Sequence, residues 1–407
     1  MDDMTMQRVA LITIGDPNDM SSWSGTQYRV YQQLLKQFDV VEPLGPVELS
    51  KIEAFLVKVV HKIFRTIFGK YNQVHSLLCG YLRARHFSRK IKQKDYSIVF
   101  ASACCPVVAF LDIEQPIVYL SDATFSLLLD YYEQFSGLPG LSVFEGNYAE
   151  QKAMDKAAVI LLSSEWARQS AIKDYGVDPD KVRTCLFGAN TDAGSETEES
   201  INLKNVTATQ GHVGMQCHLL FLARDWHRKG GGIALETFLE LRKEGFQVSL
   251  TICGCVAEQA EDIEGVTVIP YLDKALDTDR QRYHKLMCQS HFLILPTLAD
   301  CTPMVFAEAN AYGMPVITTN TGGIPSLITE ENGCLLPPNS DGKAYAEVVG
   351  NLFFRDPNRY QRLVRSSRHR YEKVLNWDSW GGCVKAFIES RLSANLNLEI
   401  DTSGGHL

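Results

Sequence analysis

The segment from residue 292 to residue 336 constrains the fold of this 407-residue chain more than any other. It begins with the apolar run FLIL, residues 292–295, which is short enough for a buried strand. After a polar turn, Thr302 and Pro303 have the residue types of a helix N-cap and a first helical residue. The predicted helix stops at Gly313, because glycine and a proline soon after it commonly end a helix.

The same segment continues with a second strand and a second helix. Residues 316–319 form the next predicted strand, and the Gly-Gly-Ile-Pro run at 322–325 opens another helix. Strand, helix, strand, helix with short joins is the βαβ pattern of a parallel sheet, which binds ligands beyond the carboxyl ends of its strands. The backbone amides of Met304 and Val305, at the positive end of the predicted helix, suit a phosphate at that edge.

Two acidic residues complete this candidate site. Glu308 follows Met304 by four residues, so its side chain lies on the same helix face about one turn further in. A carboxylate there can accept both hydroxyls of a ribose. Asp300, just before the helix, can accept sugar hydroxyls on the other side of the phosphates. Either acid alone would more commonly be a helix cap, so the prediction depends on their spacing.

These motifs together resemble the signature of family 4 glycosyltransferases, retaining enzymes of the GT-B fold. The matching residues are Asp300, Glu308, the A-x-A-x-G-x-P-V run that follows Glu308, and T-G-G-I-P at 321–325. The resemblance implies that the first carboxylate touches the donor sugar and that the second holds the ribose. The chain departs from the family at two positions, with Asp300 in place of the usual Glu and Pro303 in place of the usual Gly. The first change shortens the reach to the sugar, whereas the second keeps a helix start.

Composition describes an ordinary globular protein. Hydrophobic residues make up 45% of the chain and charged residues 22%. The sequence contains no run of about eighteen apolar residues, the length needed to cross a membrane. The first residues, MDDMTMQRVALITIGD, do not have the pattern of a signal peptide. Eleven cysteines, including the neighbours Cys104 and Cys105, lack paired CxxC spacing and predict reduced core thiols in a cytoplasmic protein without a metal site. The net charge of −8 argues against nucleic-acid binding.

The segment 51–94 differs from this background, because it holds eleven Lys or Arg and a single acid, Glu53. Within it, apolar residues recur with helical spacing. We expect the helix to bury this apolar stripe in the amino-terminal domain and to expose its lysines and arginines to solvent. The alternative is a basic amphipathic helix that lies on an anionic membrane, at the inner surface of the cell. The apolar residues are Ile52, Phe55, Leu56, Val59, Val60, Ile63, Ile67 and Phe68.

Two positions in the amino-terminal half are candidate site residues. A predicted strand at residues 8–14 is followed by a loop in which Gly25 matches the glycine-rich loop that, in the family, faces the donor diphosphate and the acceptor. In the same loop, Trp23 either stacks on an acceptor ring or packs internally. A predicted strand at 117–120 leads to Asp122, where many family members carry a histidine beside the reacting carbon. Asp122 either accepts a proton or a sugar hydroxyl, or caps the following helix.

In the carboxy-terminal half, a predicted strand at 218–223 ends at Arg224, and Lys229 follows five residues later, before a predicted helix at 233–243. The pair resembles the family's phosphate-binding pair, whose cations neutralise the leaving diphosphate. We expect the neighbours of Lys229, His227 and Arg228, to face solvent. The resemblance also implies that a backbone group near Leu272 contacts the base.

The Asp277-Thr278-Asp279 run resembles a manganese-binding DxD motif, but it is predicted to cap a helix, since GT-B enzymes need no metal. Glu150 lies at a position where members of the family often have a glutamate. No resident cofactor is therefore expected.

The predicted architecture is α/β, with two Rossmann-like domains of the GT-B type and the donor site in the cleft between them. Residues 1–192 form the predicted acceptor domain, 193–212 a polar linker, and 213–377 the nucleotide-sugar domain. Residues 378–407 are predicted to form a helix that crosses back to the first domain and a loose tail.

The predicted function is transfer of a sugar, with retention, from a nucleoside diphosphate sugar to an acceptor. The enzyme is expected to be of the hexosyltransferase type and independent of metal. A UDP-sugar is the favoured donor, and the acceptor is a small molecule, a glycan or a lipid. The alternatives are a sugar-nucleotide epimerase or phosphorylase on the same fold, or a non-catalytic subunit that binds a sugar nucleotide.

Overall fold

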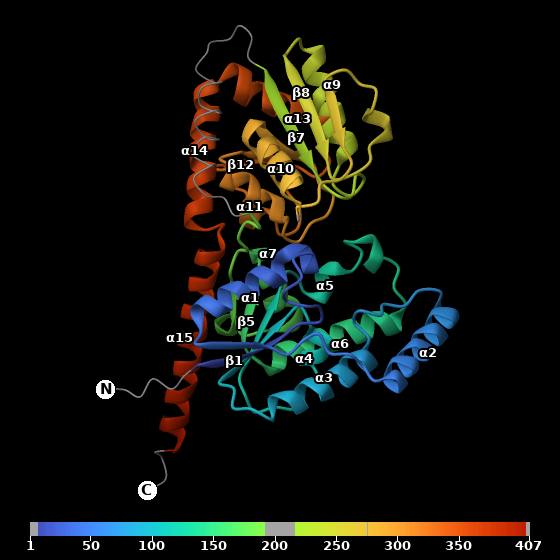
Figure 1. The fold of residues 1–407 in the computed structure, drawn as a ribbon, viewed down its shortest axis with the longest axis vertical. Helices are drawn as coiled ribbons and strands as arrows, with labels where there is room; N and C mark the ends of the chain where they lie inside the picture. Colours follow the sequence, from blue (N-terminus) through green and yellow to red (C-terminus); the bar gives the residue numbers. More distant parts are fainter. Residues whose placement is uncertain (1–6, 192–215, 275, 404–407) are drawn as a thin grey trace. The chain divides into compact units, whose positions relative to one another are not determined.

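The computed structural model describes residues 7–191, 216–274 and 276–403, with side chains up to residue 393 (Figure 1). The predicted linker at 193–212 lies outside the described residues. The chain divides into two compact units: the first contains Met1–Leu186 together with Trp377–Leu407, and the second runs through Phe187–Asn376.

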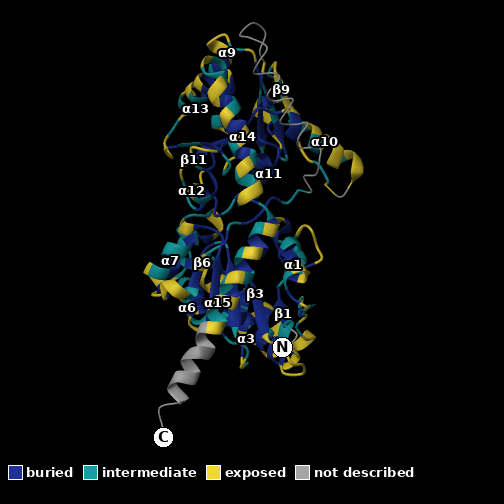
Figure 2. Cartoon of the chain, turned by 90° about the vertical axis from the view of Figure 1, so that its left-hand side faces the viewer, coloured by how far each residue is buried: buried dark blue, intermediate teal, exposed yellow. Residues whose placement is uncertain are grey.

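The first unit is built on a six-stranded parallel sheet with the strand order β2-β1-β3-β4-β5-β6. Most residues of its central strands are fully buried, as expected for a parallel sheet covered on both faces (Figure 2). The strands are β1 (Arg8–Ile12), β2 (Val40–Pro43), β3 (Ile98–Ser102), β4 (Ile117–Ser121), β5 (Ala157–Leu162) and β6 (Val182–Thr184).

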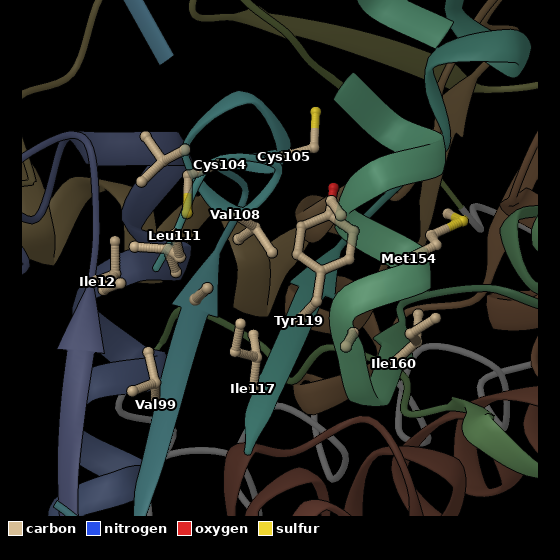
Figure 3. Packing of buried hydrophobic residues seen from close by; sticks show 14 of the residues in the cluster. Ile12, Val99, Cys104, Cys105, Val108, Leu111, Ile117, Tyr119, Met154 and Ile160 are labelled. Atoms are coloured by element: carbon tan, nitrogen blue, oxygen red, sulfur yellow. The ribbon is translucent and has the colours of Figure 1, made fainter. Parts of the chain in front are cut away.

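Helices cover both faces of this sheet. Alternate residues of β1, Ala10 and Ile12, pack in one cluster with side chains of α3, α4, α6 and α7 (Figure 3). Helix α15 packs against α1, where Asp378 accepts a hydrogen bond from Gln33 at 2.8 Å and pairs with Lys36 at 2.7 Å. The helices are α1 (Thr26–Gln37), α2 (Lys51–Phe68), α3 (Leu77–Ile91), α4 (Cys105–Val108), α5 (Phe125–Leu128), α6 (Gly140–Lys156), α7 (Glu165–Tyr175) and α15 (Trp377–Ser403).

The second unit repeats the design with a six-stranded parallel sheet in the order β12-β11-β10-β7-β8-β9. Its strands are β7 (Cys217–Leu222), β8 (Val248–Cys253), β9 (Val266–Ile269), β10 (Phe292–Leu295), β11 (Val316–Thr319) and β12 (Gly333–Leu336). Its helices are α9 (Gly231–Lys243), α10 (Asp277–Gln289), α11 (Met304–Ala311), α12 (Ile324–Leu327), α13 (Gly342–Val349) and α14 (Pro357–Lys373).

Two local predictions in the second unit need correction. Helix α11 begins at Met304 and not at Pro303, which takes the N-cap position instead of Thr302 and has no side-chain group to cap the helix. The residues Asp277 and Asp279, predicted to cap a helix from the loop before it, instead form the first turn of α10. Asp279 accepts the amide hydrogen of Asp273 at 2.9 Å, so it stabilises the loop before the helix.

Helix α2 forms as predicted, with a capping box in which Ser50 and Glu53 bond each other's backbone amides. The expectation that its apolar stripe is buried is wrong. Only Val57 and His61 of this helix are buried, because α2 packs through a different, narrower face. Seven of the eight stripe residues are exposed, from 36% for Val59 to 75% for Ile52. Within the described residues, no helix combines the length and the hydropathy of a membrane-crossing segment.

Candidate functional site

The carboxyl ends of β7 and β10 bring two loops of the second unit together. The strands pair in parallel, with Phe292 opposite Leu219 and Leu293 opposite Leu220. The loops that follow the two strands therefore begin at the same edge of the sheet. The loop after β7, residues 223–230, therefore lies beside the loop after β10, residues 296–303. The Leu298 amide donates to the Arg228 carbonyl oxygen at 2.8 Å and joins the two loops.

Glycine allows this close approach. Gly230, the N-cap of α9, has a φ of 76°, and a Cβ atom there would lie 2.0 Å from the carbonyl oxygen of Pro296. A Cβ on Gly231 would lie 2.2 Å from the ring of Trp226, which is buried beneath the loop. The Gly-Gly pair after Lys229 is therefore required for packing as well as for the turn.

Two cationic side chains of the loop after β7, Lys229 and Arg228, approach Asp300, and a third cation, Arg224, lies near the start of the same loop. Lys229 forms an ion pair with the Asp300 carboxylate, and both side chains are largely buried, at 14% and 10% exposure. Arg228 donates to the Ala299 carbonyl oxygen at 2.8 Å and lies 3.9 Å from Asp300, so its side chain, at 34% exposure, faces solvent only in part. Arg224 is exposed just after β7, and His227 is exposed as predicted.

The pairing of Lys229 with Asp300 changes how these residues work. The sequence assigned the lysine to a phosphate and the aspartate to a sugar, as separate contacts. In the structure each fixes the position of the other, because a half-paired buried charge would be costly. Any ligand phosphate that binds Lys229 therefore also experiences the negative electrostatic potential of the Asp300 carboxylate.

The start of α11 lies directly after this loop. Its N-cap, Pro303, provides no side-chain hydrogen bond, and the Phe306 amide already donates to the Pro303 carbonyl oxygen at 3.0 Å. Met304 and Val305, which supply the first two helical amides, are half-buried. Helix starts without a side-chain cap bind anions readily, because orphan amides and the helix dipole act together.

Glu308, one turn further along α11, is almost fully buried, at 3% exposure. Its Oε2 atom accepts a hydrogen bond from the Tyr283 hydroxyl and lies 3.1 Å from Lys274 Nζ, whereas Oε1 has a longer contact of 3.3 Å with the same lysine. Burial and the charge of Glu308 raise the pKa of Tyr283 well above its ordinary value, so this hydroxyl remains a donor. Oε1 thus keeps capacity for a ligand hydroxyl.

Sequence reasoning missed Lys274 and Tyr283. They lie 34 and 25 residues before Glu308, and no motif links them to it. Lys274 Nζ also lies 3.8 Å from the centre of the Tyr283 ring, a favourable cation–π distance. Leu272, the expected base contact, is half-buried after β9, two residues before Lys274. The loop after β9 therefore connects Leu272 to the carboxylate of Glu308.

In the first unit, Gly25 ends a run of three left-handed residues. Trp23, Ser24 and Gly25 have φ values of 48°, 56° and 85°. Glycine adopts this conformation freely, but for tryptophan and serine it is uncommon, and such strain concentrates at functional sites. Trp23 is half-buried and Ser24 is exposed at this turn before α1.

Asp122 is half-buried just after β4, close to a buried acid of α6. That acid, Glu150, accepts a hydrogen bond from the Tyr119 hydroxyl at 3.0 Å. Burial, with a smaller contribution from the charge of Asp122, raises the pKa of Glu150 to about 7. Thr124 is the N-cap of α5 and makes no side-chain cap bond. Among the described residues, no group of three or more His, Cys, Asp or Glu could hold a metal ion.

Solved structures identify the class of this fold. Sucrose-phosphate synthase from Thermosynechococcus elongatus matches with a TM-score of 0.64 and 16% identity, over 95% of this chain and 100% of that one. HepE from Anabaena, in complex with UDP and glucose, matches with a TM-score of 0.54 and 14% identity, over 95% and 100%. The two Rossmann-like units form a GT-B fold, as predicted.

The sequence of the second unit matches a known family model. Residues 216–353 match the model of the glycosyl transferases group 1 family, which confirms the resemblance seen in the motifs. The D-inositol 3-phosphate glycosyltransferase of Corynebacterium glutamicum is 21% identical over 271 residues, which are 63% of this chain and 62% of that protein. The chain thus spans less than two thirds of that curated relative.

Proposed function

We propose that this protein transfers a sugar from a nucleoside diphosphate sugar to an acceptor, with retention at the anomeric carbon. The observation that carries the proposal is the cluster at the carboxyl edge of β7 and β10. There, the Lys229–Asp300 pair lies just before the uncapped start of α11, and Glu308 lies one turn further in. A cation, the first amides of a helix and a buried acid in this order fit a diphosphate followed by a ribose.

Departure of the diphosphate places negative charge on the leaving oxygen. Arg224, Lys229 and the amides of Met304 and Val305 stabilise that charge as it develops, and preorganised donors of this kind are each worth roughly 10²–10³ in rate. These groups supply the cationic charge themselves, so we propose that turnover does not require a metal ion. A phosphate oxygen then takes the proton of the acceptor, which attacks from the face that the leaving group vacates.

Donor recognition involves the second half of the site. Glu308 accepts the ribose hydroxyls through Oε1, and Lys274 and Tyr283 hold the carboxylate in place. The base lies against the backbone near Leu272, and Asp300 orients the donor sugar. We propose a UDP-sugar as the donor because HepE, with the same fold, was solved with UDP and glucose. Gly25 and Asp122, at the carboxyl ends of β1 and β4, contribute from the first unit.

The test is a donor screen followed by two matched variants. UDP-, GDP- and ADP-sugars are incubated with the protein, and slow release of the nucleotide identifies the donor. Lys229→Ala is expected to lower turnover by about 10²–10³-fold, whereas Lys243→Ala, an exposed lysine on α9 with 74% side-chain exposure, leaves it unchanged. If Lys229→Ala turned over the donor as fast as the parent protein, Lys229 would not neutralise the charge of the leaving diphosphate.

The same screen separates the alternative functions. With a labelled donor, transfer of label to an added acceptor supports the transferase. Conversion of the donor to an epimer, or phosphate-dependent cleavage, would favour the epimerase or phosphorylase. Calorimetric binding of the donor without any turnover would favour a non-catalytic subunit.

We further propose that this cytoplasmic enzyme meets its acceptor at an anionic lipid bilayer, through α2. The exposed stripe recurs every three or four residues, at Ile52, Leu56, Val59, Ile63 and Ile67, and so forms one continuous face of the helix. Phe55 adds an aromatic ring to that face, at 65% exposure. A helix with an exposed apolar face of this kind lies in the interface plane of a membrane.

The positive charge of α2 favours an anionic lipid surface over other binding partners of its apolar face. Lys51, Lys58, Lys62 and Arg65 are all exposed and share a third face of the helix, beside the apolar one. The single acid, Glu53, is engaged by Ser50 and by His86, whose Nε2 lies 3.0 Å from its carboxylate. In a chain of net charge −8, this local excess of positive charge complements anionic headgroups.

Co-sedimentation with vesicles tests this docking surface. We expect the protein to pellet with phosphatidylglycerol-containing vesicles at low salt and not with pure phosphatidylcholine. Replacing Phe55 and Ile63 by serine abolishes pelleting, and Lys58→Glu with Lys62→Glu reduces it. The control variant, Leu239→Ser, replaces an exposed leucine of α9, at 44% exposure, which lies outside the apolar stripe of α2. Failure to pellet, or a dimer in solution that Phe55→Ser dissociates, would overturn the membrane proposal.

A further inference from the structure

Two cysteines of the first unit, far apart in sequence, lie against each other. Cys185 directly follows β6 and is buried, with its amide bonded to the Leu162 carbonyl oxygen at 2.8 Å. Cys383 lies in the second turn of α15 and is half-buried. Their Sγ atoms are 2.7 Å apart across 198 residues of sequence. That separation is within about 1 Å of the ~2.05 Å of a disulfide bond, so a small side-chain movement would allow a bond.

The surroundings make the two thiols unequal. The hydrogen bond from Cys185 lowers the pKa of Cys383, burial opposes this, and the nearby Arg183 guanidinium lowers it further. The contact with Cys383 and burial both raise the pKa of Cys185, which therefore keeps its proton. A half-exposed thiolate beside a second cysteine is the arrangement found at oxidant-reactive sites.

We propose that Cys185 and Cys383 form a hydroperoxide-reactive dithiol that closes to a disulfide. In the first step, the Cys383 thiolate attacks one peroxide oxygen, the S–O bond forms, the O–O bond breaks, and hydroxide leaves. In the second step, the sulfur of Cys185 attacks the sulfenic sulfur, the S–S bond forms, and the S–O bond breaks. The proton of Cys185 leaves with the second oxygen, so one hydrogen peroxide and two thiols yield one disulfide and two waters.

The position of this pair gives the bond a defined consequence. The chain passes from the first unit to the second after Leu186, next to Cys185, and returns at Trp377, six residues before Cys383. A disulfide would therefore fasten the returning helix α15 to the end of β6 and enclose the whole second unit in one covalent loop. This inference does not depend on the proposed transferase activity.

Peptide mapping of the full-length protein provides the test. After treatment with hydrogen peroxide, we expect alkylation to find two fewer thiols per chain, a loss that a thiol reductant reverses, and a disulfide-linked peptide pair that joins Cys185 to Cys383. Cys334 is the matched control, because it is also half-exposed but burial raises its pKa. Cys334→Ser should form the bond at the parent rate.

Variants of each member separate the two steps. Cys185→Ala should stop at a sulfenic acid on Cys383 that dimedone traps, and Cys383→Ala should lose no thiol rapidly. Loss of Cys334 before Cys383, or absence of the joined peptides from oxidised parent protein, would overturn the proposal. The mapping of the parent protein decides the matter even where Cys185→Ala fails to fold.

Discussion

Replacing Gly230 by alanine tests how tightly the site depends on the approach of its two loops. Gly230 has a φ of 76°, which costs an alanine about 1–2 kcal/mol. The added Cβ would lie 2.0 Å from a backbone oxygen of Pro296, and backbone cannot rotate away as a side chain could. Overpacking of this kind costs roughly 1–3 kcal/mol, so the whole change destabilises the second unit by about 2–5 kcal/mol.

Gly232, two residues further on, is the matched control. An added Cβ there meets no atom within 4 Å, and the residue lies in the first turn of α9. Alanine is a better helix former than glycine by about 0.5–1 kcal/mol, so Gly232→Ala should be neutral or slightly stabilising.

Thermal unfolding followed by circular dichroism measures both variants. For a unit of about 150–250 residues, 1 kcal/mol shifts the midpoint by roughly 2–4 °C. We therefore expect Gly230→Ala to unfold roughly 4–20 °C below the parent, with weakened donor binding because Lys229 moves with the loop. If Gly230→Ala and Gly232→Ala had the same midpoint, the close approach to Pro296 would not be a constraint, and the reasoning would be refuted.

Three further predictions concern single buried side chains. Glu150 holds its proton up to about pH 7 in the folded state but loses it near pH 4.5 in the unfolded state. The free energy of unfolding should therefore fall by about 1.4 kcal/mol for each unit that the pH rises between these two values. Glu150→Gln should remove that slope in urea titrations, and an unchanged slope would contradict the assignment. Trp380→Ala, which empties a 1% exposed site on α15, should cost about 3–5 kcal/mol in the same urea assay. Tyr283→Phe should weaken UDP-sugar binding about tenfold by calorimetry, because Glu308 loses an orienting donor; tighter binding would show that Tyr283 competes with the ribose.

The regular elements of this fold were largely predictable from local chemistry. Buried parallel strands appear as short apolar runs, and the structure places strands at 292–295 and 316–319, as the sequence predicted. Glycine marked the end of α11 to within two residues, since the helix predicted to stop at Gly313 ends at Ala311. The short edge strand β2 (Val40–Pro43) was not predicted, because four residues of mixed polarity carry no periodic signal.

The errors arose where tertiary contacts decide the outcome. Periodicity shows that α2 has an apolar face, but not whether anything covers it, and the helix packs through Val57 and His61 instead. Likewise, the spacing of Asp300 and Glu308 identified two acids but not their partners. Lys229 and Lys274 reach these acids across loops whose course depends on the whole sheet.

The order of the chain has a consequence for how the protein is made. The second unit is one continuous stretch, 187–376, whereas the first unit combines residues before 187 with α15 from Trp377 onward. During synthesis, the later unit can therefore finish folding while the earlier one still waits for its last helix. Until α15, with its buried Trp380, packs against α1 and β5, the nascent chain exposes an apolar surface to which chaperones can bind.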